Sequence, residues 1–373
     1  MSDTYGKKLN AEQLVSFLDH VFKSNDQLQM NGRRITPVLV WGKHGQGKTE
    51  TVLDYAKKRN WQIAYCAPAQ FEEMGDLHGM PKILDPNPMI DGDEITIYSP
   101  PSWIPKSEGP GIMVLDDINR ADDRILRGVM QLLQNFELLS WKLPPKWQIV
   151  ATANPDDGNY SVTSMDDAMI TRMLHVTLEF DVNVWIKWAI ENEIDERGIS
   201  FVTLYPECVQ GRRTTPRSLV HFFDQIKYIA DLRSNLEFIH IIADSALDEV
   251  TTAAFMKFVL EDLEMLINPF DILESEDWSK TEKKLKQGVT DKSGDVRIDM
   301  LAVLFMRLFK YISSKNYIYT DKRKNNLIEL MLCKFVPSDL SMSLYLDIMR
   351  EGSQELKNIV KDSRLSKLMI NSM

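Results

Sequence analysis

One short stretch, residues 42–49, constrains the fold of this chain more than any other part of its sequence. It reads Gly-Lys-His-Gly-Gln-Gly-Lys-Thr and fits the phosphate-binding pattern G-x-x-x-x-G-K-[ST] without a mismatch. The apolar segment 36–41 before it predicts a buried strand, and residues 51–58 after it predict a helix. A strand, a glycine-rich loop and a helix in this order predict an α/β domain whose loop amides and helix N-terminus hold phosphate groups.

Each part of this loop has an expected role. Lys48 is expected to reach the β- and γ-phosphates of a nucleotide, and the Thr49 hydroxyl is expected to bind Mg²⁺. The predicted nucleotide-binding residues are Gly42, Lys43, His44, Gly45, Gln46, Gly47, Lys48, Thr49 and Glu50. The alternative is a glycine-rich turn that fits the pattern by chance, and the flanking strand and helix argue against it.

Length and charge limit the classes of protein to consider. A chain of 373 residues is expected to form two or three domains. Its net charge of −10 argues against a surface that binds nucleic acid over its whole extent, although a local basic patch is compatible with it.

The three cysteines, Cys66, Cys208 and Cys333, are far apart in the sequence, so we expect neither a disulfide framework nor a zinc site. We expect a cytoplasmic protein, without a signal peptide at residues 1–10 and without a membrane span.

The apolar segments indicate how the chain is organised. Buried strands are expected at 36–41, 61–67, 111–115, 147–154 and 175–180, with helices at 11–23, 51–58 and 121–136. Continuously apolar strands that alternate with helices predict a parallel five-stranded sheet with helices on both faces. A proline-rich insertion at about 75–110 is expected to be irregular, with one strand of a hairpin near 94–98.

The remaining chain predicts helices only. We expect an α/β nucleotide-binding domain at 1–180, a helical lid domain at 181–270, and a helical region of unknown role at 271–373. The apolar run 298–312 contains charged residues and is too short to span a bilayer, so a buried helix is expected there.

Polar residues that follow the predicted strands are the catalytic candidates. Asp116 ends a strand where a carboxylate would hold Mg²⁺, and Asp117 follows it. Two adjacent acids at a strand end also suit the start of a solvated loop. Asn154 ends the next strand and would hydrogen-bond the attacking water or the γ-phosphate, but Asn-Pro also begins turns.

Two arginines are candidates for stabilising charge on the γ-phosphate. Arg172 precedes the last strand and would reach the nucleotide of a neighbouring subunit; a surface salt bridge is the alternative. Arg217 begins a helix of the predicted lid and would reach the phosphates of its own subunit, with Arg212 and Arg213 as competitors for that role.

These motifs, in this order, resemble those of the AAA+ ATPases, and within them the MoxR-like group. The resemblance covers roughly residues 36–230. Residues 115–121, Leu-Asp-Asp-Ile-Asn-Arg-Ala, resemble the Walker B segment of that group, and 151–155 resemble its sensor 1. Residues 165–173 resemble the arginine-finger segment, and 215–218, more loosely, the start of the sensor 2 helix.

The resemblance implies a homo-oligomeric ring, commonly a hexamer, with ATP and Mg²⁺ at the subunit interfaces. Asp116 and Asp117 would act within one subunit, Arg172 on its neighbour, and Arg217 as sensor 2. The insertion falls where the group carries an insert that faces the central pore. One departure is that Asp117 replaces the usual Glu. Its carboxylate lies about one bond nearer the backbone, on the order of 1.5 Å, which predicts slow hydrolysis or a shifted loop.

Three functions follow as hypotheses. The first is an ATP-driven remodelling machine that acts on a protein client, and the resemblance implies a partner with a von Willebrand A-type domain. The second, less favoured, is a nucleic-acid motor or loader, for which a basic C-terminal tract is the only sequence feature; a solvated face is the alternative. The third is a slow or inactive nucleotide-gated assembly module. The tract comprises Lys280, Lys283, Lys284, Lys286, Lys292, Arg297, Lys322, Arg323 and Lys324.

Overall fold

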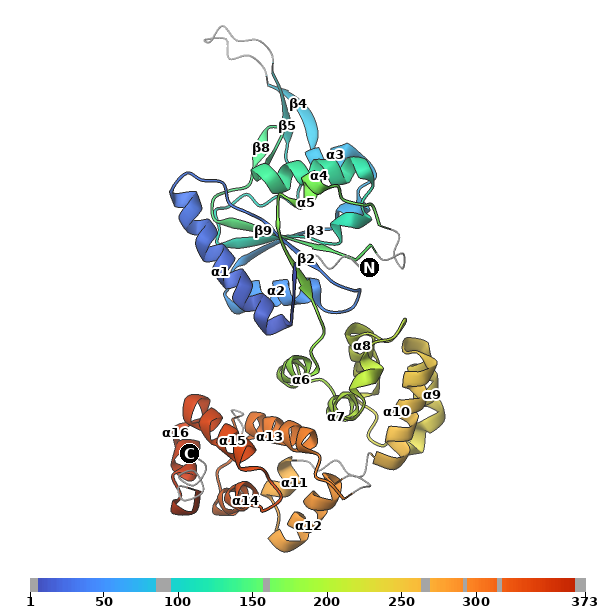
Figure 1. The fold of residues 1–373 in the computed structure, drawn as a ribbon, viewed down its shortest axis with the longest axis vertical. Helices are drawn as coiled ribbons and strands as arrows, with labels where there is room; N and C mark the ends of the chain where they lie inside the picture. Colours follow the sequence, from blue (N-terminus) through green and yellow to red (C-terminus); the bar gives the residue numbers. More distant parts are fainter. Residues whose placement is uncertain are drawn as a thin grey trace. The chain divides into compact units, whose positions relative to one another are not determined.

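The computed structural model describes residues 6–84, 95–156, 162–262, 269–290, 294–313 and 317–365. The chain divides into two compact units, Met1–Asp181 and Val182–Met373 (Figure 1). Among the described helices, none combines the length and the apolarity that crossing a bilayer requires.

The first unit is built on one sheet in which all neighbouring strands run parallel. The order of its six strands is β1-β10-β2-β9-β6-β3. Their bounds are β1 (Lys7–Leu9), β2 (Val38–Trp41), β3 (Gln62–Cys66), β6 (Gly111–Leu115), β9 (Trp147–Ala153) and β10 (Leu174–Leu178). The β9 strand lies between the strand that precedes the glycine-rich loop and the strand that ends at Asp116.

The expected number of five strands is wrong, because β1 adds a sixth at the edge of the sheet. Lys7 pairs with Val176 and Leu9 with Leu178. An edge strand needs no apolar alternation, and lysines are common on such strands. Lys7 and Lys8 are exposed, and Lys8 forms an ion pair with Glu179 at 2.8 Å. A run of Lys-Lys-Leu therefore carries no strand signal.

Helices cover both faces of this sheet, as expected (Figure 1). On one face, α1 (Ala11–Met30) and α2 (Lys48–Lys58) pack against Val38 and Val40 of β2. On the other face, α4 (Asp123–Asn135) packs in the cluster that contains Leu39 and Trp41. Because β2 is buried on both sides, its residues show a continuous apolar run instead of alternation.

The insertion contains a hairpin of two antiparallel strands, β4 (Met80–Leu84) and β5 (Ile95–Ser99). The hairpin strand expected near 94–98 corresponds to β5, and Glu94 lies outside the described residues. The short helix α3 (Met74–His78) precedes the hairpin, and β7 (Glu137–Leu138) pairs with β8 (Trp141–Lys142) beside it. Helix α5 (Asp167–Ile170) precedes β10.

The second unit is helical, as expected from the sequence after residue 181. Its first part contains α6 (Val182–Glu191), α7 (Glu196–Leu204), α8 (Pro216–Ile226), α9 (Leu236–Ala246) and α10 (Glu249–Lys257). A fully buried aromatic cluster joins three of these helices. In it the rings of Phe222 and Phe255 meet edge to face at 4.7 Å, and Phe201 lies 5.1 Å from Phe255.

The later helices of this unit enclose a separate aliphatic core. They are α11 (Pro269–Leu273), α12 (Trp278–Gly288), α13 (Ile298–Ile312), α14 (Asp321–Met331), α15 (Ser338–Glu351) and α16 (Gln354–Val360). Leu301, Leu327 and Leu356 are completely buried in that core. The expected buried helix at 298–312 is confirmed as α13. Its Arg307 pairs with Glu196 of α7, which ties the later helices to the earlier ones.

Candidate nucleotide-binding site

The glycine-rich loop connects the end of β2 to the first turn of α2. Gly45 and Gly47 have φ angles of +68° and +86°, a region that favours glycine over residues with a Cβ atom. Gly47 is the N-cap of α2, and no side chain caps that helix. The first amide groups of α2 therefore remain available to an anion, which also gains from the positive end of the helix dipole.

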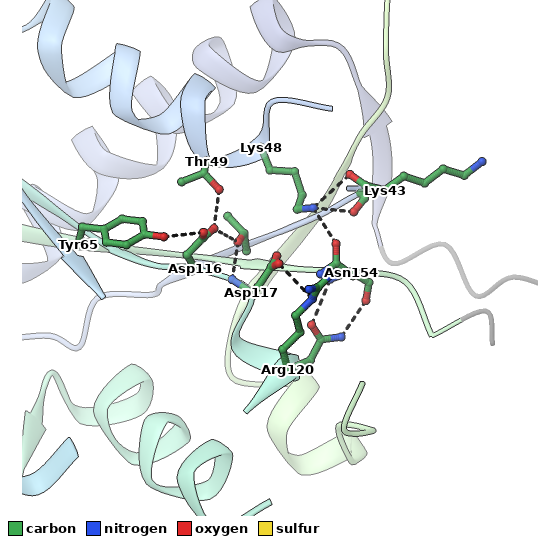
Figure 2. A network of polar contacts seen from close by, with 11 residues as sticks. Lys43, Lys48, Thr49, Tyr65, Asp116, Asp117, Arg120 and Asn154 are labelled. Carbon is green, nitrogen blue, oxygen red and sulfur yellow. Dashed lines mark hydrogen bonds and ion pairs between the residues drawn. The ribbon is translucent and has the colours of Figure 1, made fainter. Parts of the chain in front are cut away.

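Lys48 lies at the centre of this loop with only 6% of its surface exposed. Its ammonium donates to the carbonyl oxygens of Gly42 at 2.8 Å and Lys43 at 3.2 Å, and to Asn154 Oδ1 at 3.0 Å (Figure 2). These bonds hold the cationic head at the mouth of the loop, between β2 and β9. The loop lysine and the polar residue after β9 are therefore in direct contact.

Asp116, at the end of β6, accepts three hydroxyl hydrogen bonds from three different elements (Figure 2). Its Oδ1 accepts from Thr49 at 2.5 Å and from Thr152 at 2.7 Å, and its Oδ2 accepts from Tyr65 at 2.8 Å. Burial alone raises the pKa of the Asp116 carboxyl, but the three hydroxyl bonds and the Lys48 charge outweigh it and hold the pKa below its usual value. Asp116 is therefore a carboxylate at neutral pH.

Asp117 is held by its backbone and by its side chain. Its amide donates to Thr152 Oγ1 at 2.8 Å, so Thr152 bridges the two adjacent acids. Asp117 has the left-handed conformation, with φ +47° and ψ +49°. Its carboxylate forms an ion pair with Arg120 at 3.3 Å. Both side chains of that pair are partly exposed, so the pair can open at small cost.

Asn154 is fully buried and is fixed by Asn119. The Asn119 amide donates to the Asn154 carbonyl at 2.8 Å, and Asn119 Oδ1 accepts from the Asn154 backbone amide at 3.1 Å. The side-chain nitrogen Nδ2 of Asn154 has no hydrogen-bond partner among the described residues. A buried amide donor without a partner is costly and is expected to serve a ligand.

Arg172 lies in the turn between α5 and β10 and is half-buried. Within the part of the chain that the structure describes, its guanidinium has no hydrogen bond and no ion pair. The turn itself is connected to β2 through His175. Trp41 Nε1 donates to His175 Nδ1 at 2.9 Å, and His175 Nε2 lies 2.6 Å from the carbonyl oxygen of Ile170.

The three candidate arginines of the second unit differ in their surroundings. Arg213 donates to the carbonyl oxygens of Asp244 and Ser245 at the end of α9, at 2.7 and 2.9 Å. Its guanidinium thus caps a helix. Arg212 and Arg217 are exposed, and within the described residues neither side chain has a polar partner.

Three of the other predicted loop residues are exposed. Lys43 and His44 are exposed, and the Lys43 side chain extends away from the site in Figure 2. Glu50 is also exposed, and its carboxylate lies 3.6 Å from Lys57 of the same helix. Gln46 is half-buried. From these residues we expect contributions through backbone amides.

Four further residues complete this site although no sequence pattern assigns them a role: Tyr65, Thr152, Asn119 and Arg120. Thr152, Asn119 and Arg120 belong to segments whose pattern resembles a family, but their contacts depend on which strands are neighbours. Tyr65 is next to Asp116 because β3 pairs with β6. No motif marks it, and only the strand order could have revealed it.

The site fits a nucleoside triphosphate with Mg²⁺. The described residues contain no group of three His, Cys, Asp or Glu side chains that could hold a metal by themselves. Mg²⁺ at phosphate sites commonly takes only one or two protein oxygens and completes its shell with water and phosphate. Thr49 and Asp116 supply such oxygens, and the Asn154 amide and the uncapped α2 N-terminus supply donors for phosphate.

The chain is similar to one family model and to several solved structures. The family model described as AAA domain (dynein-related subfamily) matches residues 37–173. No curated protein matches the chain. Among solved structures, the RuvB Holliday junction branch migration motor of Thermotoga maritima is similar at 15% identity and a TM-score of 0.37, over 71% of this chain and 74% of that one. A mutant of the same protein is similar at 14% identity and a TM-score of 0.40, over 71% of this chain and 76% of that one.

A third structure, a putative ATPase from Cytophaga hutchinsonii, is similar over 94% of this chain and 88% of that one, with 13% identity and a TM-score of 0.31. The family match and the parallel sheet with its phosphate loop together show a P-loop fold of the AAA+ type in the first unit. The expected fold class is confirmed, apart from the number of strands. The finer likeness to the MoxR-like group stays a prediction.

Proposed function

We propose that this chain is a Mg²⁺-dependent ATPase that binds ATP at the loop 42–49. One observation carries the proposal: Lys48 donates to Asn154 and its chain neighbour Thr49 donates to Asp116, so four polar residues from three separate segments meet at the end of the sheet (Figure 2). Chemistry on phosphoryl groups depends mostly on such positioning and on charge stabilisation.

Each side chain has a task in this proposal. Lys48 binds the β- and γ-phosphates, and the unpartnered amide of Asn154 donates to the γ-phosphate or to the attacking water. Thr49 and Asp116 hold Mg²⁺, which when bound neutralises charge on the phosphate oxygens. Asp117 orients the attacking water once its ion pair with Arg120 opens.

The finer part of the proposal concerns assembly. We propose a homo-oligomeric ring, a hexamer by resemblance to MoxR-like proteins, in which Arg172 acts on the nucleotide of the neighbouring subunit and Arg217 acts as sensor 2. The guanidinium of Arg172 is without a described partner, which supports a role outside its own unit. Such a ring would remodel a protein client, with a von Willebrand A-type protein as the partner that the resemblance implies.

The nucleic-acid alternative rests on α12. Lys280, Lys283, Lys284 and Lys286 are exposed, and no carboxylate among the described residues pairs with them. Lys322 and Arg323, by contrast, form ion pairs with Glu274. Lys292 lies outside the described residues, and the exposed members of the tract that the structure describes all lie on α12, which fits a solvated face as well as a phosphate surface. Binding of DNA or RNA that weakens with salt and stimulates hydrolysis would select this alternative.

The test of the ATPase proposal is phosphate release at steady state, with and without Mg²⁺, for the native protein and for Asp117→Asn. Loss of a catalytic base or orienting group is expected to lower turnover at least about a hundredfold. Binding of labelled ATP by Asp117→Asn is expected to remain. If the native protein binds ATP but releases phosphate no faster than Asp117→Asn, the chain is the nucleotide-gated module of the third hypothesis and the ATPase proposal fails.

A further inference from the structure

The carboxylate of Asp116 has nearly all of its acceptor positions filled by the protein itself. An ionised carboxylate offers about four lone-pair positions, two on each oxygen. Thr49 and Thr152 donate to Oδ1 at 2.5 and 2.7 Å, which fills that oxygen. Tyr65 donates to Oδ2 at 2.8 Å, so one position remains, on the oxygen that the phenol also contacts.

Tyr65 reaches this carboxylate from the edge strand of the sheet. On β3, Tyr65 is opposite Val114 and Cys66 is opposite Leu115, so the phenol lies beside the end of β6 where Asp116 begins. The side chain is 47% exposed. Burial in the core therefore does not account for a tyrosine at this position, and its main polar contact is the bond to Asp116.

The direction of this bond follows from its geometry and from ordinary chemistry. The phenol oxygen lies 2.8 Å from Asp116 Oδ2 and carries the hydrogen, whereas an ionised carboxylate can only accept. Tyr65 is therefore the donor, and Asp116 the acceptor.

We propose that Tyr65 is a positioning residue for the metal of this site: its phenol fixes the Asp116 carboxylate so that a single acceptor position on Oδ2 stays available to Mg²⁺. This inference rests on the proposed function. Tyr65 touches neither nucleotide nor metal and acts through Asp116. Groups that orient a metal-binding carboxylate typically change metal affinity 10- to 100-fold when removed, about the range we expect here.

The fold offers a matched control in Tyr55. Its phenol also donates to an aspartate, Asp19 Oδ1, at 2.8 Å, but that pair joins α2 to α1 about two helical turns along α2 from Lys48. Tyr55→Phe removes the same chemical bond without touching Asp116. Any general effect of losing a tyrosine–aspartate bond appears in both variants, and an effect on the metal appears only in Tyr65→Phe.

The experiment titrates Mg²⁺ into each protein in the presence of a fluorescent ATP analogue and measures the Mg²⁺ concentration for half-maximal binding. For Tyr65→Phe we expect that concentration to rise about tenfold or more, while affinity for the analogue in EDTA stays within about twofold of the native value. Tyr55→Phe is expected to match the native protein. Thermal unfolding of all three proteins separates a metal effect from a folding defect.

Three outcomes would overturn the inference. An unchanged Mg²⁺ requirement in Tyr65→Phe would mean that the phenol does not orient Asp116. A lower requirement would mean that the phenol competes with the metal. Equal loss of analogue affinity with and without Mg²⁺ would mean that Tyr65 supports the nucleotide or the fold. If the native protein itself shows no response to Mg²⁺, the proposed function fails first, which distinguishes the two failures.

Discussion

Asp117 is the residue at which this site departs most from the expected ATPase geometry. It has the left-handed backbone conformation, which aspartate tolerates better than most residues. Its amide is anchored to Thr152, and its carboxylate is turned to Arg120. A short acidic side chain on an anchored backbone has little reach, so the distance between its carboxylate and the attacking water is expected to limit the rate.

We therefore expect Asp117→Glu to raise the turnover of ATP. The longer side chain extends the carboxylate by about one bond, on the order of 1.5 Å, and a displacement of about 1 Å can change a rate by roughly a hundredfold. Steady-state phosphate release at saturating Mg·ATP measures the effect. Asp123→Glu, on the exposed first turn of α4, is the matched control and should leave the rate unchanged. A lower rate in Asp117→Glu would show that the pocket is adapted to aspartate.

At the scale of residues, the sequence predicts the site residues that lie within one short motif, but not the contacts between distant segments. Lys48, Thr49 and Asp116 could be predicted because each lies in a short motif with a fixed local setting. The direct bonds of Thr49 and Thr152 to Asp116 join segments that are far apart in the chain, and Tyr65 depends on the order of the strands. No local pattern contains that information.

At the scale of elements, the apolar strands can be predicted from the sequence, but the polar end of helix α1 and the polar edge strand β1 cannot. Helix α1 was expected at 11–23 but extends to Met30. Its later turns are fixed by Asn25, which is buried and bonds to Gln148 and to the Thr36 carbonyl, both at 2.8–2.9 Å. A buried polar residue interrupts the apolar period, so the periodicity ends before the helix does. The edge strand β1 escaped prediction for a similar reason, since its lysines are exposed.

The packing of β6 on β9 gives a prediction at this scale. A Cβ atom on Gly111, the first residue of β6, would lie 2.8 Å from three ring atoms of Trp147. Trp147 is 2% exposed and donates to the Ser107 carbonyl, so its ring has little room to move. Gly111→Ala is expected to lower the free energy of unfolding of the first unit by about 1–3 kcal/mol.

Urea unfolding measures this change, and Gly75→Ala in α3 is the control. A Cβ atom there meets nothing nearer than Met80 Sδ at 3.9 Å, so that substitution is expected to be neutral or to stabilise by up to about 1 kcal/mol. Equal unfolding midpoints for Gly111→Ala and the native protein would show that Trp147 moves aside freely.

At the scale of the whole molecule, the open question is which residues act on a neighbour. The first unit carries the phosphate loop and Arg172, and the second carries Arg217 in a helical unit. A residue that acts on a neighbouring subunit needs no partner within its own chain, and Arg172 has none among the described residues. For this reason the roles of both arginines stay predictions.

Mixing variants tests the shared interface. Arg172→Ala and Asp117→Ala proteins are each expected to lose most of their turnover. In a mixture, an Arg172→Ala subunit keeps its own Asp117 and can receive Arg172 from an Asp117→Ala neighbour, so part of the activity should return. A mixture of Lys48→Ala with Asp117→Ala is the control, because both residues act within their own subunit and no complete site forms. Absence of rescue in the first mixture would argue against an arginine supplied by a neighbour.

The most direct test of the whole account is equilibrium binding of ATP in the presence of Mg²⁺ to the native protein, to Lys48→Ala and to Lys58→Ala. The account predicts saturable binding to the native protein and to Lys58→Ala, a variant of the same helix with the same change of charge. For Lys48→Ala it predicts affinity at least about tenfold lower, as the loss of a charge-assisted bond of about 1.5–3 kcal/mol requires. Equal affinities for Lys48→Ala and the native protein would contradict the account.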